Sequence, residues 1–118
     1  MVNKRQTGTA YEEQAAAWLT DRGFRILERN YRCRQGEIDL IGRDGPYLVF
    51  IEVKYRSSKS AGEPAEAVDW RKQRRISKAA LYYCYEHRVP ETQACRFDVV
   101  AILGSHVEHI KNAFEMQA

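Results

Sequence analysis

Two acidic residues and one lysine in the middle of the chain have the types and spacing needed for metal-assisted hydrolysis. Asp39 lies in a short apolar segment, and Glu52 and Lys54 end a run of aromatic and aliphatic residues. Two carboxylates held close together repel each other unless a cation lies between them, and Mg²⁺ and Mn²⁺ prefer oxygen ligands of this kind. A lysine beside such an ion can orient or deprotonate a water molecule and stabilise the charge that develops on a phosphate. Because residues i and i+2 of a strand point to the same side, Glu52 and Lys54 can act together.

A β-hairpin is the element that would position these side chains. Residues 37–41 and 47–54 are rich in aliphatic and β-branched residues, and a segment with two glycines and a proline separates them. A turn of about four residues at 44–47 places Asp39 opposite Glu52, with their Cβ atoms about 5 Å apart. Other registers are possible, so this pairing is a hypothesis.

The hairpin also admits an ordinary structural role for these charges. Alternation sends Ile38 and Leu40 to the face opposite Asp39, and on a one-sided sheet Lys54 can simply pair with Asp39 or Glu52. Three observations favour a site instead. The charges follow an apolar run, where an unpaired charge is costly, another acid lies two residues before Asp39, and a cationic segment begins at Lys54.

The positive charge of the chain is concentrated in that segment. The 118 residues include 19 Lys and Arg against 16 Asp and Glu, a net charge of +3. Residues 54–78 hold eight cations and three acids, a net charge of +5, which leaves −2 for the remainder. Such a segment attracts phosphate backbones or anionic membrane surfaces, and it can equally be the solvated face of a helix.

The whole pattern predicts one α/β domain in which helices pack on a mixed sheet. The expected elements are helices at 10–22 and 64–87, strands at 24–31, 37–41, 47–54, 94–103 and 107–110, and a polar loop at 57–62. Thr9 is expected to cap the first helix and Gly23 to end it. A chain of this length can bury a core without disulfides or metals.

No feature of the sequence indicates a secreted or membrane-embedded protein. The cysteines, Cys33, Cys84 and Cys95, are widely spaced and odd in number, which favours reduced thiols over a zinc site or a disulfide framework. The N-terminal residues lack an apolar signal segment, and the longest aliphatic run, 99–103, is too short to span a bilayer. We therefore expect a cytoplasmic protein with no membrane partner.

Several short motifs are spread over nearly the whole chain. They are Glu12-x-x-Ala15-x-x-Trp18-Leu19, Gly36-Glu37-Ile38-Asp39-Leu40-Ile41, Phe50-Ile51-Glu52-Val53-Lys54-x-Arg56, Lys72-x-x-Arg75-Ile76, Arg96-Phe97-Asp98-Val99-Val100 and Asn112-Ala113-Phe114. Together they resemble the PD-(D/E)XK nuclease superfamily. More closely, the chain resembles the YraN-type uncharacterised bacterial family, which is similar to archaeal Holliday-junction resolvases. The resemblance implies a restriction-endonuclease-like mixed β-sheet flanked by helices, with residues 1–118 as a single nuclease-like domain.

The resemblance also implies roles for individual residues. The metal-binding acids of the superfamily fall on Asp39 and Glu52, and its catalytic lysine falls on Lys54. Val53 would supply a further metal ligand through its backbone carbonyl. A glutamate of the first helix, which falls on Glu12, would be a fourth catalytic residue.

The helix glutamate could be either of two neighbours. The family often has glycine before this glutamate, whereas this chain has Tyr11, which leaves Glu13 as an alternative to Glu12. Glu12 borders the apolar stripe of the predicted helix, and this position favours it.

Seven cations are expected to contact nucleic acid through its phosphates, without reading its sequence. They are Arg56, Lys59, Arg71, Lys72, Arg74, Arg75 and Lys78. Lys72 lies on the apolar face of its helix, so its side chain either extends to solvent or reaches into a polar site. Asp98, by contrast, is expected to be the structural partner of an arginine rather than a metal ligand.

The sequence therefore favours a divalent-metal-dependent DNA endonuclease that uses Mg²⁺ or Mn²⁺; branched DNA is a substrate that only the resemblance implies. The alternative is a non-catalytic nucleic-acid-binding protein that keeps the nuclease fold, and a weaker one is a protein-interaction subunit in DNA repair or uptake. Related resolvases are dimers, so the resemblance also implies a homodimer, for which the residues themselves give no indication.

Overall fold

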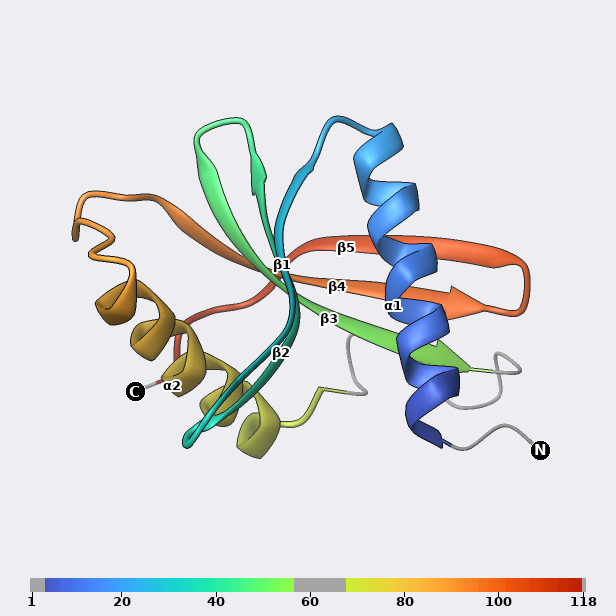
Figure 1. The fold of residues 1–118 in the computed structure, drawn as a ribbon, viewed down its shortest axis with the longest axis horizontal. Coiled ribbons are helices and arrows are strands. Elements are labelled where there is room, and N and C mark those ends of the chain that lie inside the picture. Colours follow the sequence, from blue (N-terminus) through green and yellow to red (C-terminus); the bar gives the residue numbers. More distant parts are fainter. Residues whose placement is uncertain (1–3, 57–67, 118) are drawn as a thin grey trace.

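A five-stranded mixed sheet with one helix packed on each face forms the protein (Figure 1). The computed structural model describes residues 4–56 and 68–117, and describes side chains from Ala10 onward. Its elements are α1 Lys4–Asp21, β1 Arg25–Cys33, β2 Gly36–Asp44, β3 Tyr47–Arg56, α2 Trp70–Glu86, β4 Cys95–Leu103 and β5 His106–Phe114. The strands lie in chain order across the sheet, with β3 and β4 parallel and all other neighbours antiparallel. This arrangement agrees with the restriction-endonuclease-like fold class expected from the sequence.

The sheet separates two apolar cores. Ile76 of α2 and Phe50 of β3 belong to the core on one side, and Leu19 of α1 and Ile51 of β3 belong to the core on the other. Successive residues of β3 therefore serve opposite cores, as alternation along a strand requires. A strand buried on both faces reads as a continuous apolar run, which is the pattern that precedes Glu52.

Most elements extend beyond their predicted ends, α1 and β5 by the most residues. Helix α1 begins at Lys4, so Thr9 lies inside it rather than capping it, and the helix stops before Gly23, whose φ of +95° suits glycine. Strand β5 continues to Phe114, because it stays paired with β4 and the Phe114 ring stacks on Phe97 with centroids 5.0 Å apart. Neither helix of the described residues is long and apolar enough to cross a membrane.

Helix α2 begins later than predicted. It begins at Trp70 rather than at residue 64, because the Asp69 carboxylate accepts a hydrogen bond from the Lys72 N–H at 2.9 Å and so caps the helix. The predicted loop at 57–62 lies outside the described residues. As the connection between the parallel strands β3 and β4, α2 must cross over the sheet.

Strict alternation fails in β2 at Asp39. The sequence predicts that Ile38 and Leu40 share a face, but Ile38 lies in the core under α2 and Leu40 in the core under α1. In β1, Asn30 has a positive φ of 54° and lies between the residues that pair with Ile38 and Leu40. Asparagine tolerates this left-handed conformation, which twists the β1–β2 ribbon locally. The prediction for Ile38 and Leu40 is therefore wrong, and Asp39 lies where the ribbon changes faces.

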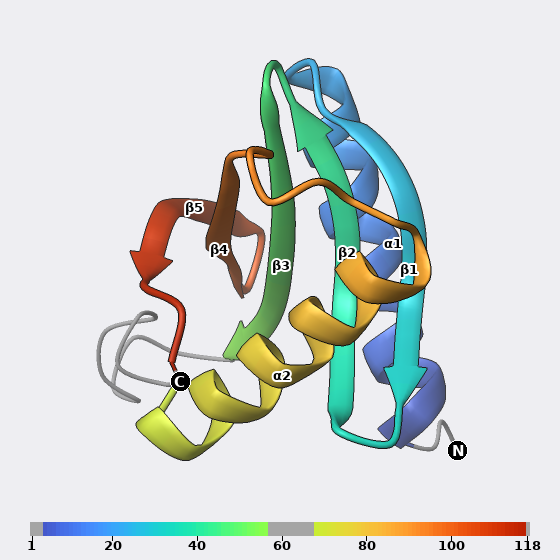
Figure 2. The same cartoon turned by 90° about the vertical axis from the view of Figure 1, so that its left-hand side faces the viewer.

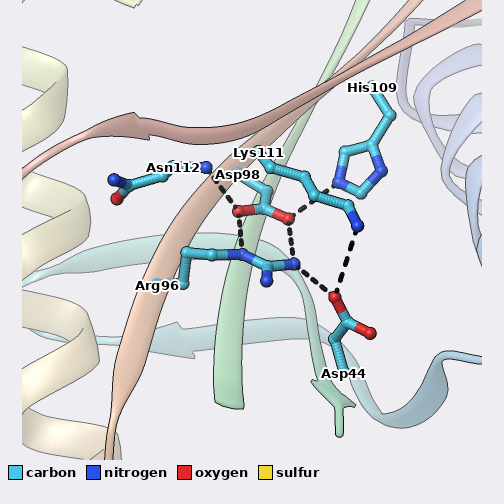
Figure 3. Close-up of polar contacts among 6 residues, drawn as sticks. All are labelled: Asp44, Arg96, Asp98, His109, Lys111 and Asn112. Carbon is cyan, nitrogen blue, oxygen red and sulfur yellow. Dashed lines mark hydrogen bonds and ion pairs between the residues drawn. The ribbon is translucent and has the colours of Figure 1, made fainter.

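A buried ionic network links β2, β4 and β5 (Figure 3). Asp98 is fully buried. Arg96 donates two hydrogen bonds to it, from Nε to Asp98 Oδ1 at 2.8 Å and from Nη2 to Asp98 Oδ2 at 2.9 Å. His109 Nε2 lies 2.7 Å from Asp98 Oδ2, and the Asn112 N–H donates to Asp98 Oδ1 at 3.0 Å. The Nη2 group of Arg96 also donates a hydrogen bond to Asp44 Oδ2 at 2.8 Å. Asp98 thus has a partner for each of its oxygens.

These contacts keep Asp98 ionised inside the protein. Burial raises the pKa of Asp98, but the hydrogen bonds from His109 and Arg96 outweigh burial and leave the pKa below its ordinary value. The prediction that Asp98 is the structural partner of an arginine is confirmed.

Replacing Asp98 with alanine should lower the free energy of unfolding by about 3–5 kcal/mol, because buried Arg96 keeps only Asp44 as a charged partner, and His109 and the Asn112 N–H lose theirs. Urea denaturation measures this loss. Lys111, which lies 3.8 Å from Asp44 and is 60% exposed, provides the control, and Lys111→Ala should cost less than about 1 kcal/mol. Equal effects of the two changes would contradict the importance of the buried network.

Candidate active site

Strands β2 and β3 separate at the position of Asp39 and Glu52. The turn at residues 45–46 sets their register, and the backbone ladder ends at the pair Leu40–Ile51. The same register, continued by one position, places Asp39 opposite Glu52, as predicted from the sequence. Figure 2 shows the two strands side by side near their turn and apart at their other ends. We call the place where they part, at Asp39 and Glu52, the fork.

A side chain replaces the backbone ladder at the fork. The Val53 N–H donates to Asp39 Oδ2 at 2.8 Å, where continued pairing would have used a backbone carbonyl of β2. This bond turns the Asp39 carboxylate toward β3. Because the N–H and C=O of a strand residue point to the same side, the Val53 carbonyl also faces β2 at the fork.

The surroundings of Asp39 favour its protonated form. Burial, together with the nearby charge of Glu52, raises the pKa of Asp39 to about 8, although the hydrogen bond from Val53 opposes the shift. Two carboxylates this close are not both ionised at neutral pH unless a cation offsets their repulsion.

Two lysines partly neutralise Glu52, which is 5% exposed. Lys72 Nζ lies 2.7 Å and Lys54 Nζ 3.6 Å from Glu52 Oε1. Lys72 therefore reaches from α2 into the polar site, which is one of the two outcomes that its sequence position allowed. Burial and the hydrogen bond with Lys72 lower the pKa of Lys54. Burial also acts to lower the pKa of Lys72, but Glu52 outweighs burial and raises it, so Lys54 is the readier of the two to release a proton.

Glu12 is a third carboxylate whose charge acts on the acids of the fork. Its Oε1 atom is buried and has no hydrogen-bond partner among the residues that the structure describes. Burial and the charge of Glu37 raise the pKa of Glu12, and Glu52 acts in the same direction. Glu13 instead pairs with Arg29 at 2.7 Å, and both of these side chains are about half exposed. The structure thus places Glu12, rather than Glu13, beside the acids of the sheet.

A pair of stacked tyrosines brings α1 to this place. The rings of Tyr11 in α1 and Tyr55 in β3 lie with their centroids 3.9 Å apart at an angle of 15°. Figure 1 shows α1 passing beside the end of β3. Because α1 and α2 cover opposite faces of the sheet, the fork receives Glu12 from one face and Lys72 from the other.

The fork lacks a complete set of protein ligands for a metal. Within residues 4–56 and 68–117, no three His, Cys, Asp or Glu side chains converge as a metal-binding group. Asp39 and Glu52 could hold an ion only as a two-carboxylate site completed by a backbone carbonyl and water. Mg²⁺ is commonly bound in this way, by one or two carboxylates and several waters.

A hollow of about 420 Å³ lies beside Lys72, between the β1–β2 turn and α2. Its lining residues are Arg32, Cys33, Gly36, Glu37, Lys72, Arg75 and Ile76. Gly36 permits the close approach of turn and helix, because a Cβ there would lie 3.1 Å from the Arg75 carbonyl oxygen. Glu37 is exposed and lies 3.5 Å from Arg32, and its charge acts on Glu12.

The other predicted cations lie mostly on the outer side of α2. Arg71, Arg74, Arg75 and Lys78 are exposed, Arg56 is partly exposed at the end of β3, and Lys59 lies outside the described residues. Sequence reasoning missed Arg32, because only the folded β1–β2 turn brings it beside α2. Arg32 lies in a strand and belongs to no helical stripe or short motif, so the sequence does not indicate that it lies beside α2.

The sequence model of the uncharacterised protein family UPF0102 matches residues 11–102. A UPF0102 protein of Lachnoclostridium phytofermentans is 50% identical over 114 residues, which cover 97% of each chain. A UPF0102 protein of Syntrophus aciditrophicus is 50% identical over 120 residues, covering 98% of this chain and 94% of the relative. One of Klebsiella pneumoniae is 50% identical over 111 residues, covering 93% and 87%. The names of these relatives state the family and no activity.

Replacing Asp39 with asparagine should stabilise the metal-free protein at alkaline pH. Between about pH 4 and about pH 8 the folded protein keeps a proton on Asp39 that the unfolded chain has lost, so the stability contributed by this group falls as the pH rises through that range. Asparagine removes this ionisation and still offers an oxygen to the Val53 N–H.

Melting temperatures in the presence of a chelator test this expectation. Between pH 5 and pH 8.5 the melting temperature of the wild type should fall more than that of Asp39→Asn, and the variant should melt about 4 °C higher at the upper pH, which corresponds to about 1 kcal/mol. Glu13→Gln, at an exposed ion pair, is the control and should shift little. Parallel pH profiles of wild type and Asp39→Asn would contradict the raised pKa.

Proposed function

For this chain, which belongs to the uncharacterised protein family UPF0102, we propose metal-dependent hydrolysis of DNA phosphodiesters. The observation that carries the proposal is the fork, where Asp39 and Glu52 lie on two strands just beyond the end of their pairing, with Lys54 beside Glu52. A carboxylate oxygen of Glu12 is buried without a partner among the described residues, and the charge of Glu12 acts on Asp39.

The residues at the fork fit a hard divalent cation. Asp39 and Glu52 would hold it through their carboxylates, and Val53 through its carbonyl. The raised pKa of Asp39 and the unpartnered oxygen of Glu12 both indicate that the described residues do not supply enough positive charge for all the carboxylates to be ionised together. When bound, Mg²⁺ or Mn²⁺ would polarise a phosphate oxygen and lower the pKa of a water molecule.

Lys54 and Glu12 would act on the water and the phosphate. Lys54 would orient the attacking water and stabilise the negative charge that grows on the phosphate. Its lowered pKa makes proton exchange near neutral pH easier than at an ordinary lysine. Glu12 would accept a hydrogen bond from the same water.

Exposed cations support nucleic acid as the partner. Arg71, Arg74, Arg75 and Lys78 would neutralise phosphates along α2, with Lys72 closest to the fork and Arg56 and Lys59 following β3. The resemblance to PD-(D/E)XK nucleases and archaeal Holliday-junction resolvases supports DNA as the substrate. Branched DNA and a homodimer rest on that resemblance alone and stay predictions.

A nucleic-acid-binding protein that does not cleave is the second candidate. The observation that favours it is the contact between Lys72 Nζ and Glu52 Oε1, at 2.7 Å, because a metal ion would use the same oxygen. In this case the two lysines would serve as the permanent counter-ions of Glu52.

The wild type should cut linear, flapped or four-way DNA in the presence of Mg²⁺ or Mn²⁺. Glu52→Gln removes the charge of a ligand, and Lys54→Ala removes the cation beside it, so each change should slow cleavage by about a hundredfold or more. Gel analysis of labelled DNA measures the rates, with Glu13→Gln as a control that should retain full activity. Binding without metal-dependent cutting on every substrate would favour the second candidate, and cutting that survives both changes would show that the activity lies elsewhere.

Mg²⁺ or Mn²⁺ should also raise the melting temperature. A concentration of about ten times the Kd should add about 1.4 kcal/mol, which is about 5 °C for a domain of this size. The rise should be larger at pH 8 than at pH 6, because protons compete with the metal for Asp39. Asp39→Asn should abolish the rise, and an equal rise in this variant would place the binding at another site.

A further inference from the structure

An exposed tryptophan stands at the start of α2 among arginines. Trp70 is 57% exposed, and the guanidinium carbons of Arg71 and Arg74 lie 5.5 Å and 5.8 Å from the centroid of its ring. These are cation–π distances, so the arginines lie against the ring. The fold does not explain this exposure, because Trp70 belongs to neither apolar core.

The surface around Trp70 connects to the candidate active site. A hollow of about 290 Å³ is lined by Trp70, Arg71, Arg74, Arg75 and Lys78, and we call it the basic trough. Arg75 also lines the hollow of about 420 Å³ that holds Lys72, and Lys72 contacts Glu52 at the fork. The two hollows therefore share Arg75, and the second of them also contains Lys72, the helix residue that contacts the fork.

The basic trough combines positive charge with an exposed aromatic ring, which suits a polyanion that carries aromatic groups. Residues 70–78 include five cations and no acid, so the trough attracts phosphates. A phosphate needs no aromatic partner, whereas the π-face of a nucleobase stacks on tryptophan whatever its sequence. A membrane surface would call for several apolar side chains around the ring, but the other residues that line this hollow are all cations.

A base that is paired in a duplex is not free to stack on Trp70. Its faces are covered by the neighbouring base pairs, and taking it out of the stack costs free energy. An unpaired nucleotide presents its base at no such cost, and the arginines beside the ring can bind its phosphates. The trough therefore distinguishes single-stranded from duplex nucleic acid.

We propose that Trp70, with Arg71, Arg74 and Arg75, forms a subsite that stacks an unpaired nucleobase and holds the adjoining phosphates. The substrate then carries a single-stranded segment next to the bond that is cut. This inference rests on the proposed nuclease function, because Arg75 and Lys72 are what link the subsite to the residues of the fork.

Binding in the absence of divalent metal tests the subsite separately from cleavage. The probes are a fluorescein-labelled dT oligonucleotide of 12 residues and a duplex of equal length, measured by fluorescence anisotropy in a chelator. Trp70→Ala should weaken binding of the single strand about tenfold or more and that of the duplex less than about twofold, and Trp70→Phe should restore most of the affinity. Tyr85→Ala is the matched control, since Tyr85 is an aromatic residue of the same helix, is 81% exposed and lies outside the basic trough.

Tryptophan fluorescence reports the stacking directly. Trp18 is the other tryptophan and lies under the guanidinium of Arg22, so Trp18→Phe leaves Trp70 as the only reporter. The oligonucleotide should quench this emission at the concentrations at which it binds. Poly-glutamate and vesicles of phosphatidylglycerol are the comparison ligands and should quench it less.

Two results would overturn the subsite: equal losses of single-strand and duplex binding in Trp70→Ala, or stronger quenching by poly-glutamate or the vesicles. These results are distinct from a failure of the proposed function. If wild type stacks the single strand but never cuts DNA with metal, the subsite stands and the nuclease proposal fails. If the protein cuts DNA and Trp70→Ala binds and cuts single-stranded substrates normally, the function stands and the subsite fails.

Discussion

The hydrogen bond from the Val53 N–H to the Asp39 carboxylate is the contact on which the arrangement of the site depends. It stands where the backbone ladder between β2 and β3 ends, and it gives the Val53 N–H a partner that the separated strands no longer provide. A buried N–H without any partner would cost about 1–3 kcal/mol. The carboxylate thus permits the strands to part beside Glu52, which Lys72 of α2 contacts.

Two aspartates of the same sheet, Asp98 and Asp39, differ in how many hydrogen bonds their carboxylates receive and in the direction in which their pKa is shifted. Asp98 receives hydrogen bonds on both oxygens from Arg96, His109 and a backbone N–H, and its pKa is lowered. Asp39 receives one backbone hydrogen bond, stands near another carboxylate, and has a raised pKa. The first is a completed structural network, whereas the second retains unsatisfied charge, which is typical of positions that bind a further group.

The sequence predicted the main parts of the fold and the register that places Asp39 opposite Glu52, because their signals are local. The order of elements and the register of the hairpin follow from apolar runs and from a short turn with Gly45. The change of faces at Asp39 escaped prediction, since it depends on the left-handed conformation of Asn30 in a different strand. The contact of Lys72 with Glu52 and the exposure of Trp70 depend on where α2 begins and how it crosses the sheet, and no local pattern encodes either.

The last residues of β3 tie both helices to one short stretch of chain. Glu52 is held by Lys72 of α2, while Tyr55, three residues later, is stacked on Tyr11 of α1. Alternation sends these two contacts to opposite faces of the sheet, and close packing makes the strand between them stiff. The end of β3 therefore contacts both helices within four residues, although α1 and α2 cover opposite faces of the sheet. The positions of both helices at the fork thus depend on a single strand.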